Sequence, residues 1–275
     1  MASLKLRAAV LSLLLLLVFA GVWEFLARPV AVTASPGAAD SGLLAGSSGA
    51  RIPRPSELAV FAFEQLRDPF YDRGSNDKGI GIQLAHSLGR VLLGYGLALL
   101  VAIPLGFAIG MSQLLMRALY PFIQVLRPIS PLAWMPLALF VIKDSAASAV
   151  FVIFVCSLWP ALINTAFGVA GVHADYLNVA KTLELSKLRT AFTVILPAAA
   201  PTILTGMRIS IGVSWLVIVA AEMLVGGTGI GYYVWNEWNN LDLNAVLFSV
   251  FTIGVVGMLL DSLLAKASQW VSYES

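Results

Sequence analysis

Long apolar runs constrain the fold of this chain more than any other feature of its sequence. The hydrocarbon core of a bilayer requires about 20 apolar residues in an α-helix, and about six runs meet that length. Inside a bilayer the backbone must satisfy its own hydrogen bonds, which a helix does. We therefore predict an all-α integral membrane protein with about six transmembrane helices. The runs are Leu4–Leu26, Ser87–Met111, Leu115–Ile142, Ala146–Val172, Pro197–Leu224 and Asn244–Ala265.

The composition excludes the main soluble classes of protein. Of the 275 residues, 59% are hydrophobic and 12% are charged, whereas soluble domains carry about 25% charged residues. The 17 basic and 15 acidic side chains give a net charge of +2, so no strongly basic face is available for nucleic acid. Cys156 is the single cysteine, which excludes an intrachain disulfide. We expect membrane lipid, and no nucleic acid, among the partners.

The first apolar run has two interpretations. Residues 1–26 are long enough to form an N-terminal transmembrane helix, which is our prediction. Lys5 and Arg7 before a Leu-rich stretch also fit a secretory signal, with Val32-Thr33-Ala34 as its cleavage site.

The rest of the chain divides at one long hydrophilic segment, residues 27–82. Its part from Thr33 to Gly49 is rich in Gly, Ser and Ala and is typical of a linker. An amphipathic helix is predicted over Glu57–Asp68, at the membrane surface or in an exposed loop. Its apolar face would comprise Leu58, Phe61, Ala62 and Leu66. Residues 83–265 are the predicted core of five transmembrane helices, and residues 266–275 a cytoplasmic tail.

The distribution of Lys and Arg predicts a cytoplasmic N-terminus. With that orientation the cationic residues at the cytoplasmic ends of the spans outnumber those at the outer ends. The cytoplasmic set is Lys5, Arg7, Arg117, Lys181, Lys187, Arg189 and Lys266, and the outer set is Arg28, Lys78 and Lys143. Arg51, Arg54, Arg67 and Arg73 of the long segment would equalise the two sets if that segment were counted in full.

Several catalytic motifs are absent from the sequence. It contains no G-x-x-x-x-G-K-[ST] loop to cradle a nucleotide phosphate, and the glycines of Gly226–Gly231 do not have the G-x-G-x-x-G spacing. His86 and His173 have no His or Cys at ligand spacing, so no metal site is predicted. Neither G-x-S-x-G nor H-E-x-x-H occurs. We predict that the chain is not an enzyme and binds no cofactor.

The loop between the fourth and fifth spans, residues 171–197, carries the densest charge cluster between two spans. Asp175 is expected to cap a short helix, and a second helix is expected to run from Ser186 towards Pro197. A solvated connector is the alternative to this helical elbow.

The same loop resembles that of a known family. Its residues lie at the spacing of the E-A-A-x-x-x-G-x9-I-x-L-P loop of the membrane subunits of ATP-binding-cassette importers. Ala180, Leu196 and Pro197 match that motif. Asn178, Val179, Glu184 and Val194 stand in place of Glu, Ala, Gly and Ile.

The resemblance extends from Gln83 to Tyr273. Arg127–Pro136 resembles the third-span motif of the nitrate, bicarbonate, sulfonate and taurine branch, and Gly206–Gly231 resembles its fifth span and outer loop. Val234–Asn240 and Gly254–Asp261 resemble nitrate permeases.

This resemblance implies a type I importer permease in a bacterial inner membrane. Its partners would be cytoplasmic ATP-binding subunits that hold ATP and Mg, a periplasmic or lipid-anchored anion-binding protein, and a second permease copy in a homodimer. The loop would be a coupling helix that docks into the ATPase. The coupling residues would be Asp175, Asn178, Ala180, Lys181, Glu184, Lys187, Arg189 and Pro197.

An anion path is predicted at the third span. Pro128, Pro131 and Pro136 interrupt its helix, and freed carbonyls at membrane depth are tolerated only in protein or beside a wet cavity. Arg127 and Arg208 are intramembrane cations, which mark a path by default. The candidates for the path are Arg127, Pro131, Asn164, Arg208, Ser210, Ser214 and Glu222.

Structural roles compete with this path. Arg127 and Arg208 are alternatively paired with Glu222 or Asp261 or reach an interface, and Arg90 is expected to reach the outer interface. Small residues every four positions in the second and fifth spans favour close helix packing. Tyr232, Tyr233, Trp235 and Trp238 form either an interfacial belt or a docking surface for the binding protein.

Together these features predict the permease of an ATP-driven importer for nitrate. Bicarbonate, nitrite, cyanate, sulfonates and taurine are the alternative substrates. A secondary transporter driven by an ion gradient, or a membrane-bound enzyme, is the alternative class, and the scarcity of central carboxylates argues against the former.

Overall fold

The computed structural model describes residues 2–27, 52–74 and 76–271. The predicted linker at residues 33–49, the predicted cleavage site, Arg28, Arg51 and the end of the tail therefore lie outside the described residues. Within the described part the chain is helical, and its strand pairing is a single bridge between Asp72 and Lys78. The predicted all-α membrane fold is confirmed.

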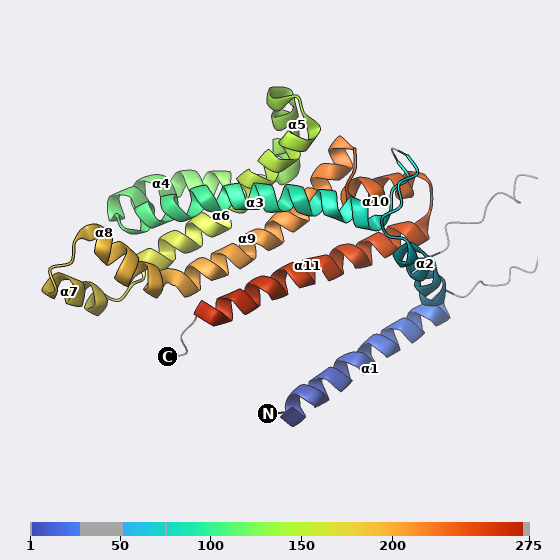
Figure 1. Ribbon diagram of the computed structural model, residues 1–275, viewed down its shortest axis with the longest axis horizontal. Helices are drawn as coiled ribbons and strands as arrows, with labels where there is room; N and C mark the ends of the chain where they lie inside the picture. The colour runs from blue at the N-terminus through green and yellow to red at the C-terminus, as the bar shows by residue number, and fades with distance from the viewer. Residues whose placement is uncertain (1, 28–51, 75, 272–275) are drawn as a thin grey trace, which may run out of the picture.

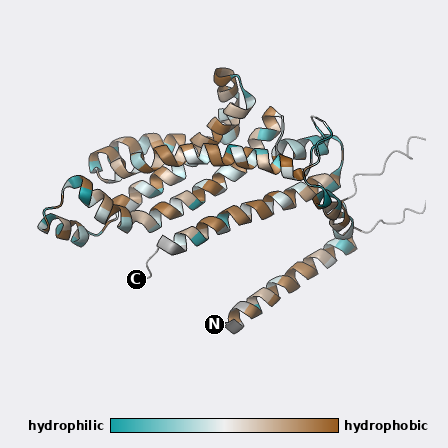
Figure 2. Ribbon diagram, in the orientation of Figure 1, coloured by the Kyte–Doolittle hydropathy of each residue, from teal (hydrophilic) through white to brown (hydrophobic). Residues whose placement is uncertain are grey.

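The centre of the fold is a layer of three long helices that run side by side (Figure 1). They are α3 (Ile80–Gly110), α6 (Ser145–Ala170) and α9 (Leu196–Val225). Val91, Ile153 and Ile218 of these helices are fully buried where they meet. A helix of this length is apolar along almost its whole course, as Figure 2 shows, because lipid rather than water surrounds it.

Small residues allow the three helices to approach closely. A Cβ atom on Gly106 of α3 would lie 2.7 Å from the carbonyl oxygen of Leu162 in α6, and one on Gly206 of α9 would lie 2.5 Å from Cβ of Asn164. The predicted role of the small-residue stripes in helix packing is thereby confirmed.

The third apolar run forms two helices instead of one span. α4 (Gln113–Leu126) and α5 (Pro131–Ile142) meet at an angle of 91°, and α5 leaves the layer (Figure 1). Pro131 begins α5 without an N–H to donate, and Ser130 Oγ accepts a hydrogen bond from Leu132 N at 3.3 Å. The described residues thus contain five helices long and apolar enough to cross a membrane, or six if α4 and α5 count as one span.

The N-terminal helix lies apart from the central layer. α1 (Ala2–Leu26) contacts α2 (Pro55–Arg67), and the carboxylate of Glu24 accepts hydrogen bonds from the backbone N–H and the hydroxyl of Ser56. α2 packs on α11 (Leu243–Val271) through Leu58 and through a ring contact between Phe61 and Phe248.

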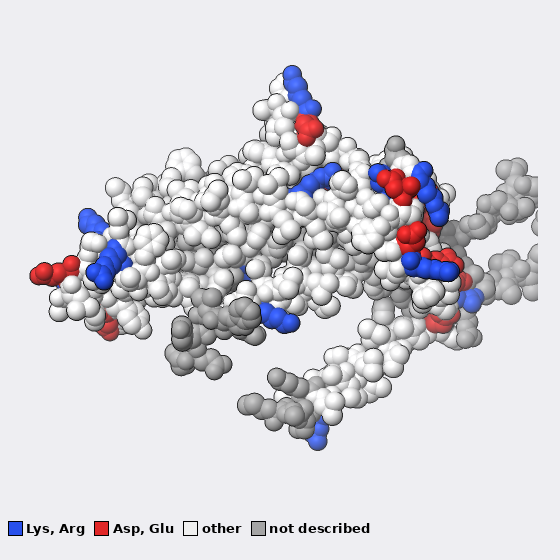
Figure 3. All heavy atoms as spheres, viewed as in Figure 1, with Lys and Arg blue, Asp and Glu red and all other residues white. Residues whose placement is uncertain are grey.

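Charged side chains mark the two ends of the molecule (Figure 3). They gather around α7 (Ala174–Thr182) and α8 (Lys187–Thr190) at one end and around α2 and the turn before α3 at the other. The helices between them are largely uncharged on the face shown. α10 (Ile230–Asn239) carries the aromatic cluster at the end opposite to α7. This distribution suits a protein that spans a bilayer with α7 and α8 on one side.

Candidate functional site

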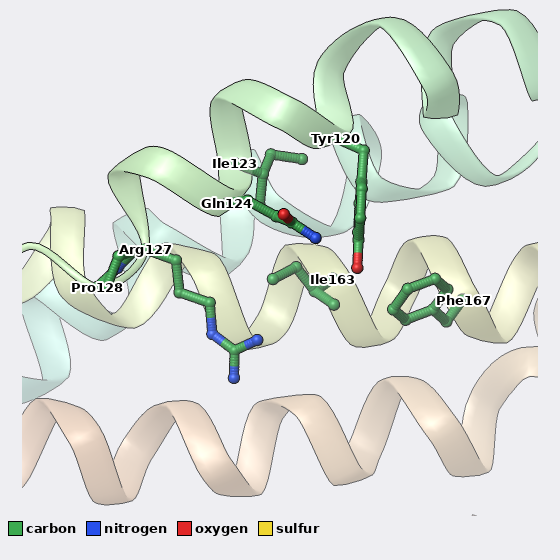
Figure 4. A pocket seen from close by; sticks show the side chains of 7 residues that line it. All are labelled: Tyr120, Ile123, Gln124, Arg127, Pro128, Ile163 and Phe167. Carbon is green, nitrogen blue, oxygen red and sulfur yellow. The ribbon is translucent and has the colours of Figure 1, made fainter.

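The bend between α4 and α5 brings Arg127 to the edge of a cavity of about 440 Å3. α4 contributes Tyr120 and Gln124, and its C-cap residue is Arg127; the three side chains extend to one side of the helix towards α6 (Figure 4). The remaining lining residues are Ile123, Pro128, Ile163 and Phe167. The Tyr120 ring meets the ring of Phe167 at a centroid distance of 6.3 Å, which positions its hydroxyl end.

Arg127 also lines a second cavity, of about 220 Å3, together with Pro131. The other lining residues are Ile129, Cys156, Trp159, Pro160, Ile209 and Val213. No Asp or Glu of the described residues lines either cavity, and within the same part of the chain Arg127 forms no ion pair. A permanent cation thus lines two cavities at the bend and has no carboxylate partner among the described residues.

The second intramembrane cation, Arg208, has a partner. Its Nε and Nη2 atoms each lie 2.5 Å from an oxygen of Asp261, which joins α9 to α11 by a bidentate ion pair. Of the interpretations that the sequence left open for Arg208, the structure shows the pairing with Asp261. Its guanidinium is therefore already neutralised within the chain.

Glu222 pairs with Arg90 and with neither of the two candidate cations. Its carboxylate is fully buried and accepts hydrogen bonds from Arg90 Nη1 at 2.6 Å, Ser87 Oγ at 2.8 Å and Gly231 N at 3.0 Å. The sequence did not indicate this partner of Arg90, whose side chain is 18% exposed and also donates to Thr228 O of the glycine-rich loop. The pair is held between α3 and the end of α9.

This network fastens the glycine-rich loop to α3. Gly229 N donates to Gln83 Oε1 at 2.6 Å, and Ile230 N donates to Ser87 Oγ at 2.9 Å. A Cβ atom on Gly229 would lie 2.2 Å from Cδ of Glu222, so only glycine permits this approach. Glu222 therefore has a structural role that its place among the path candidates did not indicate.

The remaining candidates for the path donate hydrogen bonds to helix carbonyls. Ser210 Oγ donates to Ser157 O, Ser214 Oγ donates to Ser210 O at 2.8 Å, and Asn164 Nδ2 donates to Pro160 O at 2.8 Å. Both serines are fully buried. None of these three side chains lines either of the two cavities at Arg127.

Sequence reasoning missed Tyr120 and Gln124. Together with Arg127 they occupy positions i, i+4 and i+7 of α4, which place them on one helical face. That spacing was readable in the sequence. The bend that turns this face towards a cavity was the part that needed the structure.

The charged loop forms the expected elbow with different boundaries. The N-cap of α7 is His173, whose Nδ1 accepts from Asp175 N, and Asp175 lies in the first turn, so the expected cap at Asp175 is wrong. α8 is capped by Ser186 and continues through the π-helical turn η1 (Ala191–Ile195) into α9. The expected second helix is therefore the beginning of the fifth span, because the wider π turn accommodates Pro197 without an end to the helix.

Most of the candidate coupling residues are exposed around this elbow. Ala180 is the exception and is buried against η1. The exposed candidates are Asp175, Asn178, Lys181, Glu184, Lys187, Arg189 and Pro197. α7 also exposes apolar side chains that the sequence reasoning did not select, Tyr176, Val179 and Leu183, of which 57–65% remains accessible.

Glu184 ends α7 in a conformation that favours glycine. Its φ is +50°, and Leu185 N closes the helix end by donating to Ala180 O at 3.1 Å. The importer loop motif has Gly at this position, so the local fold is kept although the residue differs.

The sequence of this chain is similar to those of known transport proteins. Residues 100–273 match the family described as "Binding-protein-dependent transport system inner membrane component". A nitrate import permease protein NrtB of Synechocystis sp. is 44% identical over 223 residues, which cover 81% of each chain. A bicarbonate transport system permease protein CmpB of Synechococcus elongatus is 43% identical over 231 residues, which cover 82% of each chain.

Solved structures show the same fold at low sequence identity. A chain of the inward-facing MetNI methionine ABC transporter superposes with a TM-score of 0.62 at 12% identity, over 69% of this chain and 94% of that chain. A chain of an amino acid ABC transporter superposes with a TM-score of 0.56 at 14% identity, over 68% and 91%.

Proposed function

Because the chain belongs to the family of binding-protein-dependent transport system inner membrane components, we propose that it forms the membrane path for nitrate in an ATP-driven importer. The family is that of ABC importer permeases, in its nitrate and bicarbonate branch. Its members are non-catalytic membrane subunits that work with ATP-binding subunits and a substrate-binding protein.

The observation that carries an anionic substrate is the cavity at the bend of the third span. It presents the guanidinium of Arg127 to a space without Asp or Glu among the described lining residues. Arg127 belongs to the third apolar run, and a cation within a membrane span is unfavourable unless it serves a ligand or a partner. An anion that passes the bend would supply the missing counter-charge.

Nitrate is favoured over the other anions by two segments of sequence. Val234–Asn240 and Gly254–Asp261 resemble nitrate permeases, and nitrate permeases are among the relatives. Relatives named for bicarbonate match equally large parts of the chain, so bicarbonate is the alternative that the test must address.

We propose that α7 and the start of α8 dock on the cytoplasmic ATPase. The exposed apolar face of Tyr176, Val179 and Leu183 supplies the buried centre of such an interface, and Lys187 and Arg189 supply a basic rim. Since α8 continues into α9, a movement of the elbow is passed to the fifth span as a rigid-body rotation.

The rest of the assembly follows from this placement. Two copies would form a homodimer in the bacterial inner membrane with the N-terminus in the cytoplasm, and a periplasmic or lipid-anchored protein would deliver the anion at the opposite end. ATP and Mg would be held by the partner ATPase, since this sequence has no phosphate-cradling loop. Alternating access would then couple ATP binding to outward opening and hydrolysis to release inside.

The test is ATP-dependent nitrate uptake by vesicles that contain this chain, its ATPase and its binding protein. Uptake that requires ATP and resists excess bicarbonate and taurine is the expected result. ATP-dependent uptake of bicarbonate without nitrate would overturn the substrate, and uptake without the ATPase would overturn the mechanism.

The coupling segment has its own test. The double substitution Lys187→Glu and Arg189→Glu is expected to reduce co-purification of the ATPase, because it reverses the charge of the rim. Lys143→Glu is the matched control, since Lys143 is exposed at the far end of α5. Equal co-purification of both variants would contradict the proposed docking surface.

A further inference from the structure

We propose that Tyr120, Gln124 and Arg127 form a binding site for a trigonal-planar monovalent oxyanion within the membrane, and that Gln124 lets this site accept bicarbonate as well as nitrate. This proposal rests on the proposed function, for which it names the residues that bind the transported anion. Tyr120 and Gln124 are not among the residues that the sequence indicated.

The three side chains are arranged as a set of donors. They lie at i, i+4 and i+7 on one face of α4 and line the same cavity of about 440 Å3 (Figure 4). Arg127 offers a planar fork of N–H groups, Gln124 an amide and Tyr120 a hydroxyl. An oxyanion with three oxygens can thus meet one charged and two neutral donors from a single helix.

These donors are not occupied by the protein. Over residues 2–27, 52–74 and 76–271, no side-chain hydrogen bond is formed by Tyr120, Gln124 or Arg127. The other two cations of the central layer differ in this respect, since Arg90 is bound to Glu222 and Arg208 to Asp261. Of these three cations, Arg127 alone has no carboxylate partner among the described residues and so keeps its full capacity for an external anion.

The cavity has apolar walls on one side and is open on the other. Ile123, Ile163 and Phe167 form the apolar walls, whereas Tyr120, Gln124 and Arg127 are exposed, so an anion can reach them. A hydrogen bond from the charged guanidinium is stronger than one from a neutral donor. The guanidinium is planar and matches two oxygens of a planar anion at once. A weak site of this kind suits a path, because an ion must leave it as readily as it enters.

Gln124 explains how one site serves two anions. Nitrate can only accept hydrogen bonds, whereas bicarbonate also carries one hydroxyl donor. The carboxamide of Gln124 presents both an N–H donor and a carbonyl acceptor. It can therefore donate to nitrate and, after a flip of the amide, accept from bicarbonate. Selection between the two anions would then be made elsewhere in the importer.

The test measures anion binding by the assembled permease and ATPase without the binding protein. Nitrate or bicarbonate replaces chloride at constant ionic strength, and the rise in the midpoint of thermal denaturation gives the dissociation constant. We expect both anions to stabilise the wild type. Arg127→Gln should weaken binding of both by about tenfold or more, because the charge-assisted fork is lost.

Further variants distinguish a loss of anion binding from a loss of folding or assembly. Arg127→Lys keeps the charge without the fork and should bind both anions with intermediate strength. Gln124→Leu should weaken both. Gln124→Lys adds a charge that attracts either anion but offers no acceptor, so it should lower the affinity for bicarbonate relative to that for nitrate. Arg117→Gln is the control, since Arg117 is an exposed cation of α4 outside both cavities and its loss should change nothing. If Arg127→Gln fails to assemble, Arg127→Lys and the Gln124 variants carry the test.

The outcomes distinguish the site from the proposed function. Wild-type binding of neither anion, or the same dissociation constants in all Arg127 and Gln124 variants, would overturn the site while ATP-dependent nitrate uptake still stood. An equal change in the affinities for both anions in Gln124→Lys would overturn the role of Gln124. Absence of nitrate uptake by the wild type would overturn the proposed function even if planar anions bind at Arg127.

Discussion

Neutralising Glu222 is expected to destabilise the permease more than the loss of any exposed carboxylate. The Glu222 carboxylate is fully buried and accepts hydrogen bonds from Arg90, Ser87 and Gly231. Removing one partner of a buried ion pair costs about 3–5 kcal/mol. Arg90 keeps its bond to Thr228 O and is 18% exposed, so we expect Glu222→Gln to cost about 3 kcal/mol, the low end of that range.

The measurement is unfolding of the reconstituted protein by SDS titration. Glu64→Gln is the matched control, because Glu64 is exposed on α2 and its substitution removes the same charge. A double-mutant cycle with Arg90→Met isolates the pair, and we expect the double variant to be more stable than the sum of the single changes predicts. Strictly additive effects, or equal destabilisation by Glu64→Gln, would refute the reasoning.

Three further predictions follow from local geometry. Glu184→Gly should stabilise the end of α7 by about 1 kcal/mol, because the φ of +50° strains a residue with a side chain. Slower amide exchange in α7 would show this stabilisation, and unchanged exchange would contradict it. Gly106→Val should separate α3 from α6 and cost about 1–3 kcal/mol, since a Cβ there would lie 2.7 Å from a carbonyl oxygen of α6. Gly96→Val, in open space, is its control in SDS titration. A hydrogen bond from the Lys78 side chain holds the pKa of Asp72 below its usual value. The ion pair between them therefore orders the loop fully at pH values above the usual pKa of Asp, and this order is lost as the pH falls through the lowered pKa of Asp72. The protection factors of the loop amides, which are corrected for the intrinsic pH dependence of exchange, should thus stay constant from pH 7 to about pH 5 and fall below about pH 4. Lys78→Met should reduce this dependence, because the bond from Gly74 N to Asp72 remains.

The bend of the third span was predictable from the sequence only in part. Three prolines close together predicted an interrupted helix because each removes an N–H and restricts its neighbour. The angle of 91° between α4 and α5 was not predictable from them. It depends on how α5 packs against α6 and α9, which are contacts between distant parts of the chain.

The pairing of the intramembrane charges shows the same limit. Asp261 was one of two possible partners of Arg208, and the structure selects it. The partner of Arg90 was missed because Glu222 lies 132 positions away. Arg90 was expected to reach the outer interface, and Glu222 was expected on the path or beside Arg127 or Arg208. Only the packing of α3 on α9 brings the two side chains within 2.6 Å.

The sequence by itself determined that this chain lies in a membrane, that it is helical and that it carries no phosphate-cradling loop. Those properties are read from the length of apolar runs and from a short motif, which are local or compositional. The tertiary structure decided that, of Arg90, Arg127 and Arg208, two are neutralised by carboxylates while Arg127 lines a cavity without Asp or Glu among the described lining residues. The reason is physical: backbone hydrogen bonds fix helices locally, whereas the neighbours of a buried charge are set by helices that meet only after the whole chain has packed.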